Sequence, residues 1–249
     1  MTVVDATWTE QAGILRSPML TRLGLVAGFT TRALGSMAGG VYSLDAQAGN
    51  RDALARSLAF DRVVRVKQVH GAAVVHADTV GDPWPEADAL WTATSGLLLG
   101  VAAADCVPVL LADPVGRVIG AAHAGWQGTS RRAVQALVAA LVDAGARLDR
   151  LIAAIGPSIG PCCYAIDATR ADTIRERLGA DAADLLRSDA NGGIVFDLWA
   201  ANAQQLAQAG VRVIERSDLC TRSGGADVWS HRGEAGRNGT GLGIIGIPG

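Results

Sequence analysis

The feature that most constrains the fold is a set of apolar segments joined by one turn. Residues 97–104 and 106–112 are continuous apolar runs, which are typical of strands covered on both faces. The turn DPVG follows at 113–116, with proline at its second position and glycine at its fourth. Residues 117–122 then return as another apolar strand. A hairpin here makes part of the sheet antiparallel, which excludes a doubly wound parallel fold and predicts an α+β or mixed α/β class.

The same apolar stretch is not a membrane span. Residues 96–112 contain Asp105 and Pro108, and an aspartate in mid-span costs about 2.5–3.5 kcal/mol on insertion scales. The first ten residues, MTVVDATWTE, contain neither a basic segment nor an apolar run, so we expect no secretory signal and a cytoplasmic protein. The balance of 22 Lys+Arg against 24 Asp+Glu, a net charge of −2, argues against a nucleic-acid partner.

The organisation of the chain predicts one domain over residues 1–249, because no internal repeat or long polar linker interrupts it. Apolar residues at helical spacing predict a helix over 50–60, and a period near two predicts a strand over 62–69. The segment after GTS at 128–130 predicts a long helix that ends at Gly145. Further helices are expected over 168–178 and 197–209, and strands over 151–155, 211–214 and 242–247.

The hairpin register determines whether Cys106 and His123 can act together. If residues 114–115 form a two-residue loop, the numbers of two residues that face each other across the hairpin add up to 229. Cys106 and His123 then form such a pair and share one face of the sheet. A bulge at Gly116 changes the sum to 230 and places them on opposite faces. Pro108 lacks the N–H for a ladder bond, so pairing can also stop before Cys106, with irregular backbone bringing the two residues together. The sequence leaves these alternatives open.

Histidine is scarce, at positions 70, 76, 123 and 231 only. His70 ends the segment KQVH before a glycine, which places it at a strand end. His70, Cys106 and His123 together would make a His₂Cys set that leaves one tetrahedral position of a zinc ion open, as in catalytic zinc sites. Asp105, beside Cys106, is a candidate acid–base group or a hydrogen-bond partner of a ligand. The alternative for these residues is structural: a buried cysteine, incidental histidines and a carboxylate bonded to the backbone.

Candidate anion-binding residues lie in other segments. Arg32 in FTTR, Arg51 in GNR and Arg237 in GRN are candidates for binding phosphate or a carboxylate, although a single arginine of this kind is more often solvated or ion-paired. The glycine-rich passage HAGWQGTS can offer free N–H groups to an anion. The adjacent residues Cys162 and Cys163 cannot readily form an ordinary disulfide, and we interpret them as packing in a loop rich in glycine and proline.

These segments resemble the YfiH or laccase-domain family, also called the multicopper polyphenol oxidase or purine nucleoside phosphorylase family. The resemblance implies a mixed α/β sandwich and zinc ligands at His70, Cys106 and His123. Gln68, within the motif KQVHG, joins the three arginines as a candidate for substrate or phosphate binding. The matching motifs are FTTR (29–32), SLD (43–45), NR (50–51), KQVHG (67–71), EADALWT (86–92), ADCVPVLLAD (104–113), HAGWQGT (123–129), IGPSIGPCCY (155–164), CT (220–221) and SHR with GR (230–237).

The chain departs from the family pattern beside the expected site. SLD at 43–45 and a short AQAG at 46–49 stand where the family usually has SLN and a longer loop. ALGS at 33–36 stands where the family usually has GGVS, and Ala165 replaces a frequent glutamate. We expect these departures to affect substrate preference more than metal binding.

The resemblance implies an enzyme that cleaves purine nucleosides (adenosine, inosine, methylthioadenosine) with phosphate and also deaminates adenosine. A zinc ion can activate water for attack on adenine, and arginine and backbone N–H groups can hold phosphate. A copper-dependent polyphenol oxidase (laccase) is the weaker interpretation, because four histidines cannot supply a trinuclear copper cluster, although Cu²⁺ can occupy a His₂Cys site.

Two further alternatives remain. One is a cysteine or zinc amidase acting on peptidoglycan precursors, with Cys106 as nucleophile, His123 as base and Asp105 or another acid orienting it. The other is a binding module without enzymatic activity. A measurement of bound zinc distinguishes a cysteine amidase from a zinc phosphorylase: one equivalent of zinc favours the phosphorylase, and metal-free protein that loses activity on alkylation of Cys106 favours the amidase.

Overall fold

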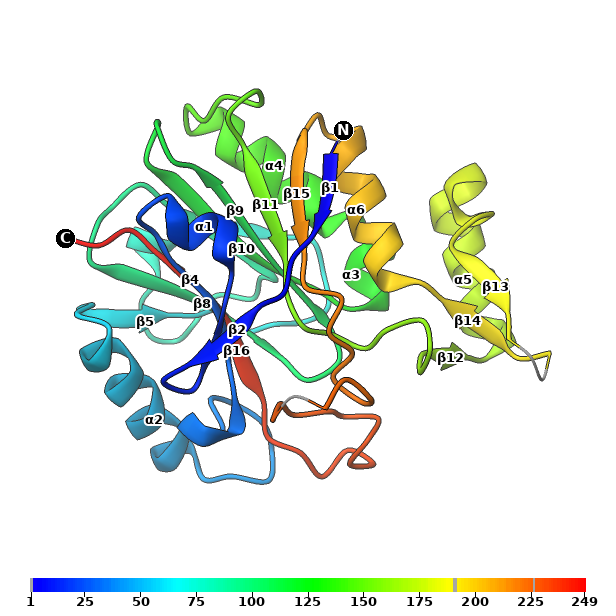
Figure 1. Cartoon of the computed structure of the whole chain (residues 1–249), viewed down its shortest axis with the longest axis horizontal. Helices are drawn as coiled ribbons and strands as arrows, with labels where there is room; N and C mark the ends of the chain where they lie inside the picture. Colours follow the sequence, from blue (N-terminus) through cyan, green and yellow to red (C-terminus); the bar gives the residue numbers. More distant parts are fainter. Residues whose placement is uncertain (1, 190–191, 226) are drawn as a thin grey trace.

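The computed structural model describes residues 2–189, 192–225 and 227–249; residues 1, 190, 191 and 226 of the domain expected over 1–249 lie outside this description. Two β-sheets pack face to face, and helices cover their outer faces (Figure 1). Within the described residues the larger sheet has seven strands, in the order β1 (Thr2–Asp5), β15 (Val213–Arg216), β11 (Ile152–Ile155), β9 (Val107–Asp113), β10 (Val118–Ala124), β7 (Ala89–Thr92) and β6 (Val74–His76). Both parallel and antiparallel pairs occur in it, which confirms the mixed α/β sandwich.

The second sheet of the sandwich has six strands in the part of the chain that the structure describes. Their order is β2 (Thr9–Gln11), β3 (Ile14–Arg16), β4 (Val26–Thr30), β16 (Gly241–Gly246), β8 (Leu97–Ala103) and β5 (Arg62–Val64). A small third sheet, β12 (Ala165–Ile166), β14 (Ile194–Phe196) and β13 (Leu186–Ser188), lies at the side of the molecule with helix α5 (Figure 1). The helices are α1 (Pro18–Arg22), α2 (Leu44–Ser57), α3 (Trp126–Ser130), α4 (Ala133–Asp143), α5 (Ala168–Leu178) and α6 (Leu198–Gln208).

Alternating side chains divide the core into layers. In β9, Leu110 belongs to the core between the two sheets, whereas Leu111 belongs to the core beneath α4 and α6. In β8, Leu99 faces the space between the sheets and Leu98 packs with Leu54 of α2 on the outer side. Strands covered on both faces by apolar groups explain the continuous apolar runs in the sequence.

The hairpin differs from the two-residue loop considered above. Residues 114–117 form a four-residue loop, and the carboxylate of Asp113 accepts hydrogen bonds from two backbone N–H groups within it. Opposed positions therefore sum to 231, from Asp113 with Val118 to Val107 with Ala124. The registers that give sums of 229 and 230 are therefore both wrong. The third alternative is confirmed: the ladder ends at the pair Val107–Ala124, so Cys106 lies just outside it.

Several predicted elements differ at their ends. Helix α2 starts at Leu44, not at residue 50, because the Ser43 hydroxyl accepts a hydrogen bond from the Ala46 N–H and caps it. The strand expected over 62–69 is regular only to Val64. The long helix expected after residue 130 is α4, which starts at Ala133 and ends at Asp143. A short helix that was not predicted, α3, precedes it, and Arg132 between the two is in a left-handed conformation (φ 61°). Among the described residues, the longest apolar helices are too short to cross a bilayer.

Candidate active site

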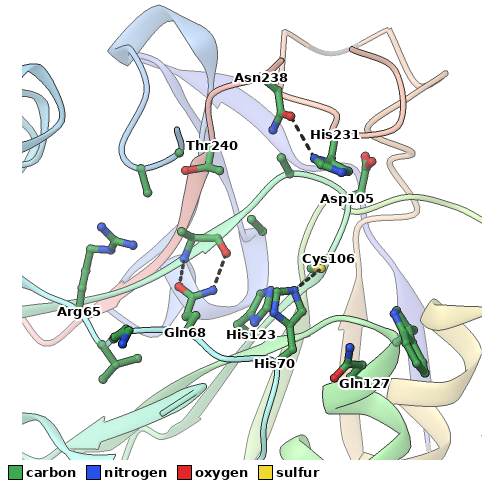
Figure 2. A pocket seen from close by; sticks show the side chains of 18 of the residues that line it. Arg65, Gln68, His70, Asp105, Cys106, His123, Gln127, His231, Asn238 and Thr240 are labelled. Atoms are coloured by element: carbon green, nitrogen blue, oxygen red, sulfur yellow. Dashed lines mark hydrogen bonds between the residues drawn. The ribbon is translucent and has the colours of Figure 1, made fainter. Parts of the chain in front are cut away.

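His70, Cys106 and His123 meet at the wall of one cavity (Figure 2). Their side-chain donor atoms lie within 4.8 Å of one another, and Cys106 Sγ is 4.0 Å from His70 Nε2. The two imidazole rings are nearly perpendicular, with centroids 4.8 Å apart. Tetrahedral zinc with nitrogen and sulfur ligands places its donor atoms about 3.3–3.6 Å apart, given bonds of 2.0–2.3 Å. The donor set therefore fits a zinc ion after a shift of about 0.5 Å between Cys106 Sγ and His70 Nε2 and of at most about 1.5 Å for the other pairs, which the exposed His70 side chain can help to make.

The local backbone brings the three residues together. His70 and Asp105 both adopt left-handed conformations, with φ of 58° and 87°, so each lies at a sharp turn beside the cavity. His123 lies in β10, opposite Pro108. Gly125 follows two residues later, and a Cβ there would lie 2.7 Å from Cys106 Sγ and 3.2 Å from His70 Cδ2. The site thus depends on a residue without a side chain at position 125.

Asp88 orients two of the three candidate ligands. Its fully buried carboxylate accepts a hydrogen bond from His123 Nδ1 at 2.9 Å, which leaves Nε2 as the nitrogen available for a metal. The same carboxylate accepts hydrogen bonds from the backbone N–H groups of Val69, His70 and Gly71, at 2.6–3.2 Å. Burial raises the pKa of Asp88, but the hydrogen bonds from His123 and this backbone outweigh it and keep the pKa below its usual value.

The charges of Cys106 and His123 are coupled. Burial raises the pKa of the Cys106 thiol, but the charge and hydrogen bonds of His123 and His70 lower it to about 6. Burial lowers the pKa of His123, whereas the Cys106 thiolate and Asp88 raise it to about 9. At neutral pH without metal, the pair is a thiolate and an imidazolium. Cys106 is therefore already in the form that binds metal.

The cavity has a volume of about 860 Å³ and is rich in cationic groups. Among the described residues, its wall contains four cationic side chains, those of Arg65, Lys67, Arg170 and Arg232, and one carboxylate, that of Asp105. Lys67 and Arg170 are paired with carboxylates outside this wall, those of Glu86 and Asp167. Aromatic rings and side-chain amides also contribute to its wall, from Trp84, Trp126, Tyr164, Gln127 and Asn238. The Asn238 amide is already engaged, with His231 and with the Gly239 carbonyl. A cavity of this size and lining suits a small, polar ligand with negative charge and a flat apolar part.

Arg65 is the most unusual of the four cations. It is only 7% exposed, it stacks over Trp84 at 5.1 Å, and its Nη1 donates to the Met37 carbonyl at 3.3 Å. Its Nε has no partner, and among the described residues no carboxylate lies within ion-pairing distance of it. Burial, followed by the charge of Arg51, lowers its pKa to about 10, so it remains charged at neutral pH. A buried charge without a counter-ion is costly, which points to an anionic ligand.

Asp105 and Gln68 line the cavity, but their polar atoms are engaged elsewhere. The Asp105 carboxylate accepts hydrogen bonds from Thr221 Oγ1, Ser230 Oγ and the Arg232 N–H, so it anchors loops behind the site. The Gln68 amide makes two hydrogen bonds with the backbone of Ala102, one as donor and one as acceptor. The structure gives both residues a positioning role beside the cavity.

The three arginines singled out from sequence lie outside the cavity wall. Arg32 is paired with Glu234 at 2.8 Å and lies over the Trp229 ring. Arg51 donates to the Met37 carbonyl at 2.7 Å, and Arg237 is exposed. Local ion pairs and backbone hydrogen bonds hold the first two away from the ligand space. Arg65, Arg170 and Arg232 occupy the wall in their place.

Of the segments where the chain departs from the family pattern, the one at 46–49 borders the cavity. Its Gln47 side chain lines the cavity, and the Gln47 amide donates to the carbonyls of Gly39 and Tyr42. The short AQAG segment at 46–49 is part of helix α2.

Sequence reasoning missed Asp88 and Arg65. Asp88 stands between apolar residues in ADALW, and a charged residue directly before a buried strand is a signal for a buried hydrogen-bonded carboxylate. Arg65 follows the apolar pair at 63–64 in the predicted strand, but only tertiary packing shows that its side chain points into the cavity wall.

Comparison with known proteins agrees with this geometry. Residues 21–248 match the family described as multi-copper polyphenol oxidoreductase laccase. The chain belongs to this family. It is 40% identical to a purine nucleoside phosphorylase of Deinococcus radiodurans, over 94% of this chain and 93% of that protein. The crystal structure of YlmD from Geobacillus stearothermophilus superposes with a TM-score of 0.86 at 33% identity, covering 99% of this chain and all of that one.

A further relative carries a different name. Adenosine deaminase RL5, from an unknown prokaryote, is 36% identical over 54% of this chain and 52% of its own length. The family resemblance inferred from sequence motifs is confirmed. The names of the relatives support an enzyme of the purine nucleoside phosphorylase type that acts on small molecules.

Proposed function

We propose that this protein is a zinc-dependent purine nucleoside phosphorylase that acts on adenosine, inosine and methylthioadenosine, and that it also deaminates adenosine. The observation that carries the proposal is the buried, unpaired Arg65 in a cation-lined cavity that also contains the His₂Cys set. Phosphorolysis needs an anion and a nucleoside in one pocket. The names of the relatives supply the reaction class.

The arginines of the cavity would hold the phosphate. Arg65 lines the cavity without a carboxylate partner among the described residues, and an arginine fork matches phosphate oxygens in geometry and charge. Arg170 and Arg232 are already placed over the rings of Trp126 and Tyr164. Stacking of this kind limits the rotamers of both guanidinium groups, so less entropy is lost when an anion binds.

His70, Cys106 and His123 would hold the zinc ion, which when bound supplies a Lewis acid for polarising the substrate and water. Asp88 keeps the His123 imidazole in one orientation and one tautomer. Gly125 leaves room for Cys106 Sγ. The aromatic side chains of the cavity would exclude water from one face of a purine, and the Gln127 amide in the same wall would hydrogen-bond its edge.

The phosphate site is tested by comparing two neighbouring arginines. Arg65 and Arg51 lie over the same Trp84 ring and donate to the same Met37 carbonyl, but only Arg65 lines the cavity. We expect Arg65→Met to raise the KM for phosphate on the order of 10–100-fold, because a hydrogen bond to a charged group contributes about 1.5–3 kcal/mol. Arg51→Met should leave it nearly unchanged. Equal effects would contradict the assignment of phosphate to Arg65.

A cysteine hydrolase, such as an amidase acting on peptidoglycan precursors, is a second candidate because Cys106, His123 and Asp88 also have the order of a nucleophile–base–acid triad. Metal analysis coupled to inosine turnover distinguishes the two. A zinc phosphorylase requires zinc in stoichiometric amount and inorganic phosphate. Activity that survives removal of metal, needs no phosphate and is lost on alkylation of Cys106 would favour the hydrolase. Activity on phenols that requires added copper would favour the oxidase.

A further inference from the structure

A second group of sulfur atoms lies apart from the candidate active site. Cys162 and Cys163, on the loop after β11, lie beside Cys220, on the loop after β15. The three Sγ atoms are all within 4.8 Å of one another, and the sulfurs of the adjacent pair are 3.5 Å apart. Packing alone was expected of the adjacent pair. The structure instead joins it to a third cysteine that is 58 residues away from Cys162 in sequence.

The Ser223 hydroxyl adds a fourth donor atom to this group. Its Oγ is 3.4 Å from Cys162 Sγ and 3.5 Å from Cys163 Sγ. In a tetrahedral zinc site with Zn–S bonds of 2.3 Å and Zn–O bonds of 2.0 Å, sulfur–oxygen distances are about 3.5 Å and sulfur–sulfur distances about 3.8 Å. The separation of Cys162 Sγ from Cys163 Sγ and the separations of both atoms from Ser223 Oγ are close to these values. Cys220 Sγ lies within 4.8 Å of the other two sulfurs, so a movement of at most about 1 Å would bring it to the remaining corner of a tetrahedron.

The buried member of the group is held as a metal-binding thiolate would be. Cys220 is only 5% exposed, and its Sγ accepts a hydrogen bond from the Gly160 N–H at 3.3 Å. Backbone N–H groups that donate to a cysteine sulfur stabilise its negative charge. Cys162 is exposed and Cys163 is half-buried, so an ion can enter from solvent.

We propose that Cys162, Cys163, Cys220 and Ser223 form a second metal site, which binds a thiophilic divalent ion, Zn²⁺, through three thiolates and one hydroxyl. Binding displaces the thiol protons into solvent, and with all four positions filled by the chain the site is closed and structural. The inference does not depend on the proposed phosphorylase activity, because the two sites share no residue.

The position of this cluster gives it a role in the shape of the active site. Thr221, next to Cys220, donates through Oγ1 to the Asp105 carboxylate at 2.6 Å. Ile159, on the loop that carries Cys162 and Cys163, donates its N–H to the Asp105 carbonyl at 2.9 Å. An ion that links the two loops therefore fixes two of the hydrogen-bond partners of Asp105, the residue directly before Cys106.

The experiment uses the full chain with His70, Cys106 and His123 all changed to alanine, so that only the second site can bind through thiolates. The reduced protein is titrated with Co²⁺, and the sulfur-to-cobalt charge-transfer absorption is followed, with Zn²⁺ added afterwards. We expect saturation at one equivalent and displacement of cobalt by zinc. Adding Cys162→Ser should weaken binding at least on the order of 10–100-fold, the loss seen when even supporting residues of metal sites are removed. Ser223→Cys should strengthen both the absorption and the affinity.

If the triple variant fails to fold, zinc stoichiometry in otherwise unchanged protein answers the same question: two equivalents are expected, and one after Cys162→Ser. The inference is overturned if the reduced protein binds no cobalt or zinc outside the first site, or if Cys162→Ser binds them as tightly as its parent. A disulfide between Cys220 and either neighbour in freshly purified protein, formed and reduced reversibly without metal, would also overturn it, because the group would then be a redox pair.

Discussion

Replacing Asp88 by asparagine tests whether one buried carboxylate prepares the whole metal site. Asparagine has nearly the same shape, but its amide nitrogen cannot accept the hydrogen bonds that the Asp88 carboxylate receives from His123 Nδ1 and from three consecutive backbone N–H groups. We expect zinc affinity to fall on the order of 10–100-fold, the usual effect of removing a hydrogen-bond partner of a ligating histidine. Stability should fall by about 3–5 kcal/mol, because the substitution breaks a buried charged pair.

Asp113 provides a matched control for this substitution. It is equally buried, at 0% exposure, and its carboxylate also accepts three backbone hydrogen bonds, from Val115, Gly116 and Arg147. It lies at the hairpin end of β9, whereas Cys106 directly precedes the other end of that strand. We therefore expect Asp113→Asn to lose stability by about 1–3 kcal/mol and to keep its zinc affinity.

The assay is competition for zinc with a chromophoric chelator, performed on both variants well below their unfolding temperatures, together with urea unfolding of the metal-free proteins. The reasoning is refuted if Asp88→Asn binds zinc as tightly as the unchanged protein. It is also refuted if Asp113→Asn loses as much affinity, because the effect would then reflect general loss of stability and not the orientation of His123.

Three other predictions concern the same site. Alanine at His70, Cys106 or His123 should each remove stoichiometric zinc while circular dichroism remains unchanged; zinc retained by any one variant excludes that residue as a ligand. Gly125→Ala should also abolish zinc binding, since its Cβ would lie 2.7 Å from Cys106 Sγ, whereas Gly49→Ala in α2, with open space around it, should bind normally. In metal-free protein the Cys106 thiolate fraction should rise with pH through its pKa of about 6, so the rate of labelling by iodoacetamide should be half-maximal near pH 6. The His123→Ala variant should need a higher pH, because His123 lowers this pKa. A half-maximal rate near pH 9 in the unchanged protein would contradict the prediction.

The sequence was sufficient to predict the central strands and to single out the three residues whose side chains meet at the cavity, His70, Cys106 and His123. Continuous apolar runs predict β8, β9 and β10 because both faces of these strands are covered, and every residue in them is buried. The helix over Ala168–Leu178 has the predicted limits, and the Asp167 side chain caps it by accepting from the Arg170 N–H. His70, Cys106 and His123 could be singled out because histidine is so rare in this chain.

The anion-binding residues could not be found in the same way. Arg32 and Arg65 are equivalent in a sequence, but one meets Glu234 and the other meets no carboxylate among the described residues. That difference arises from a contact between residues 202 positions apart, which no local pattern encodes. Short edge strands such as β6 and β12 were missed for a related reason, since two or three residues are too few to show a period of two.

The hairpin shows why an incorrect register still places Cys106 and His123 on one side of the sheet. Opposed positions sum to 231 where the two-residue loop gave 229, so the strands are displaced by an even number of residues. Because side chains alternate with a period of two, an even displacement preserves which face each residue occupies, whereas the sum of 230 would have reversed it. His123 now faces Pro108, and Cys106 lies two residues further on, beyond the last pair of the ladder. The sharp turn at Asp105 and the absence of a side chain at Gly125 then let the thiol approach the two imidazoles. The approach of Cys106 to His70 and His123 therefore depends on which face of the sheet each residue occupies and on the sharp turns at His70 and Asp105. The length of the hairpin loop matters only through whether its number of residues is odd or even.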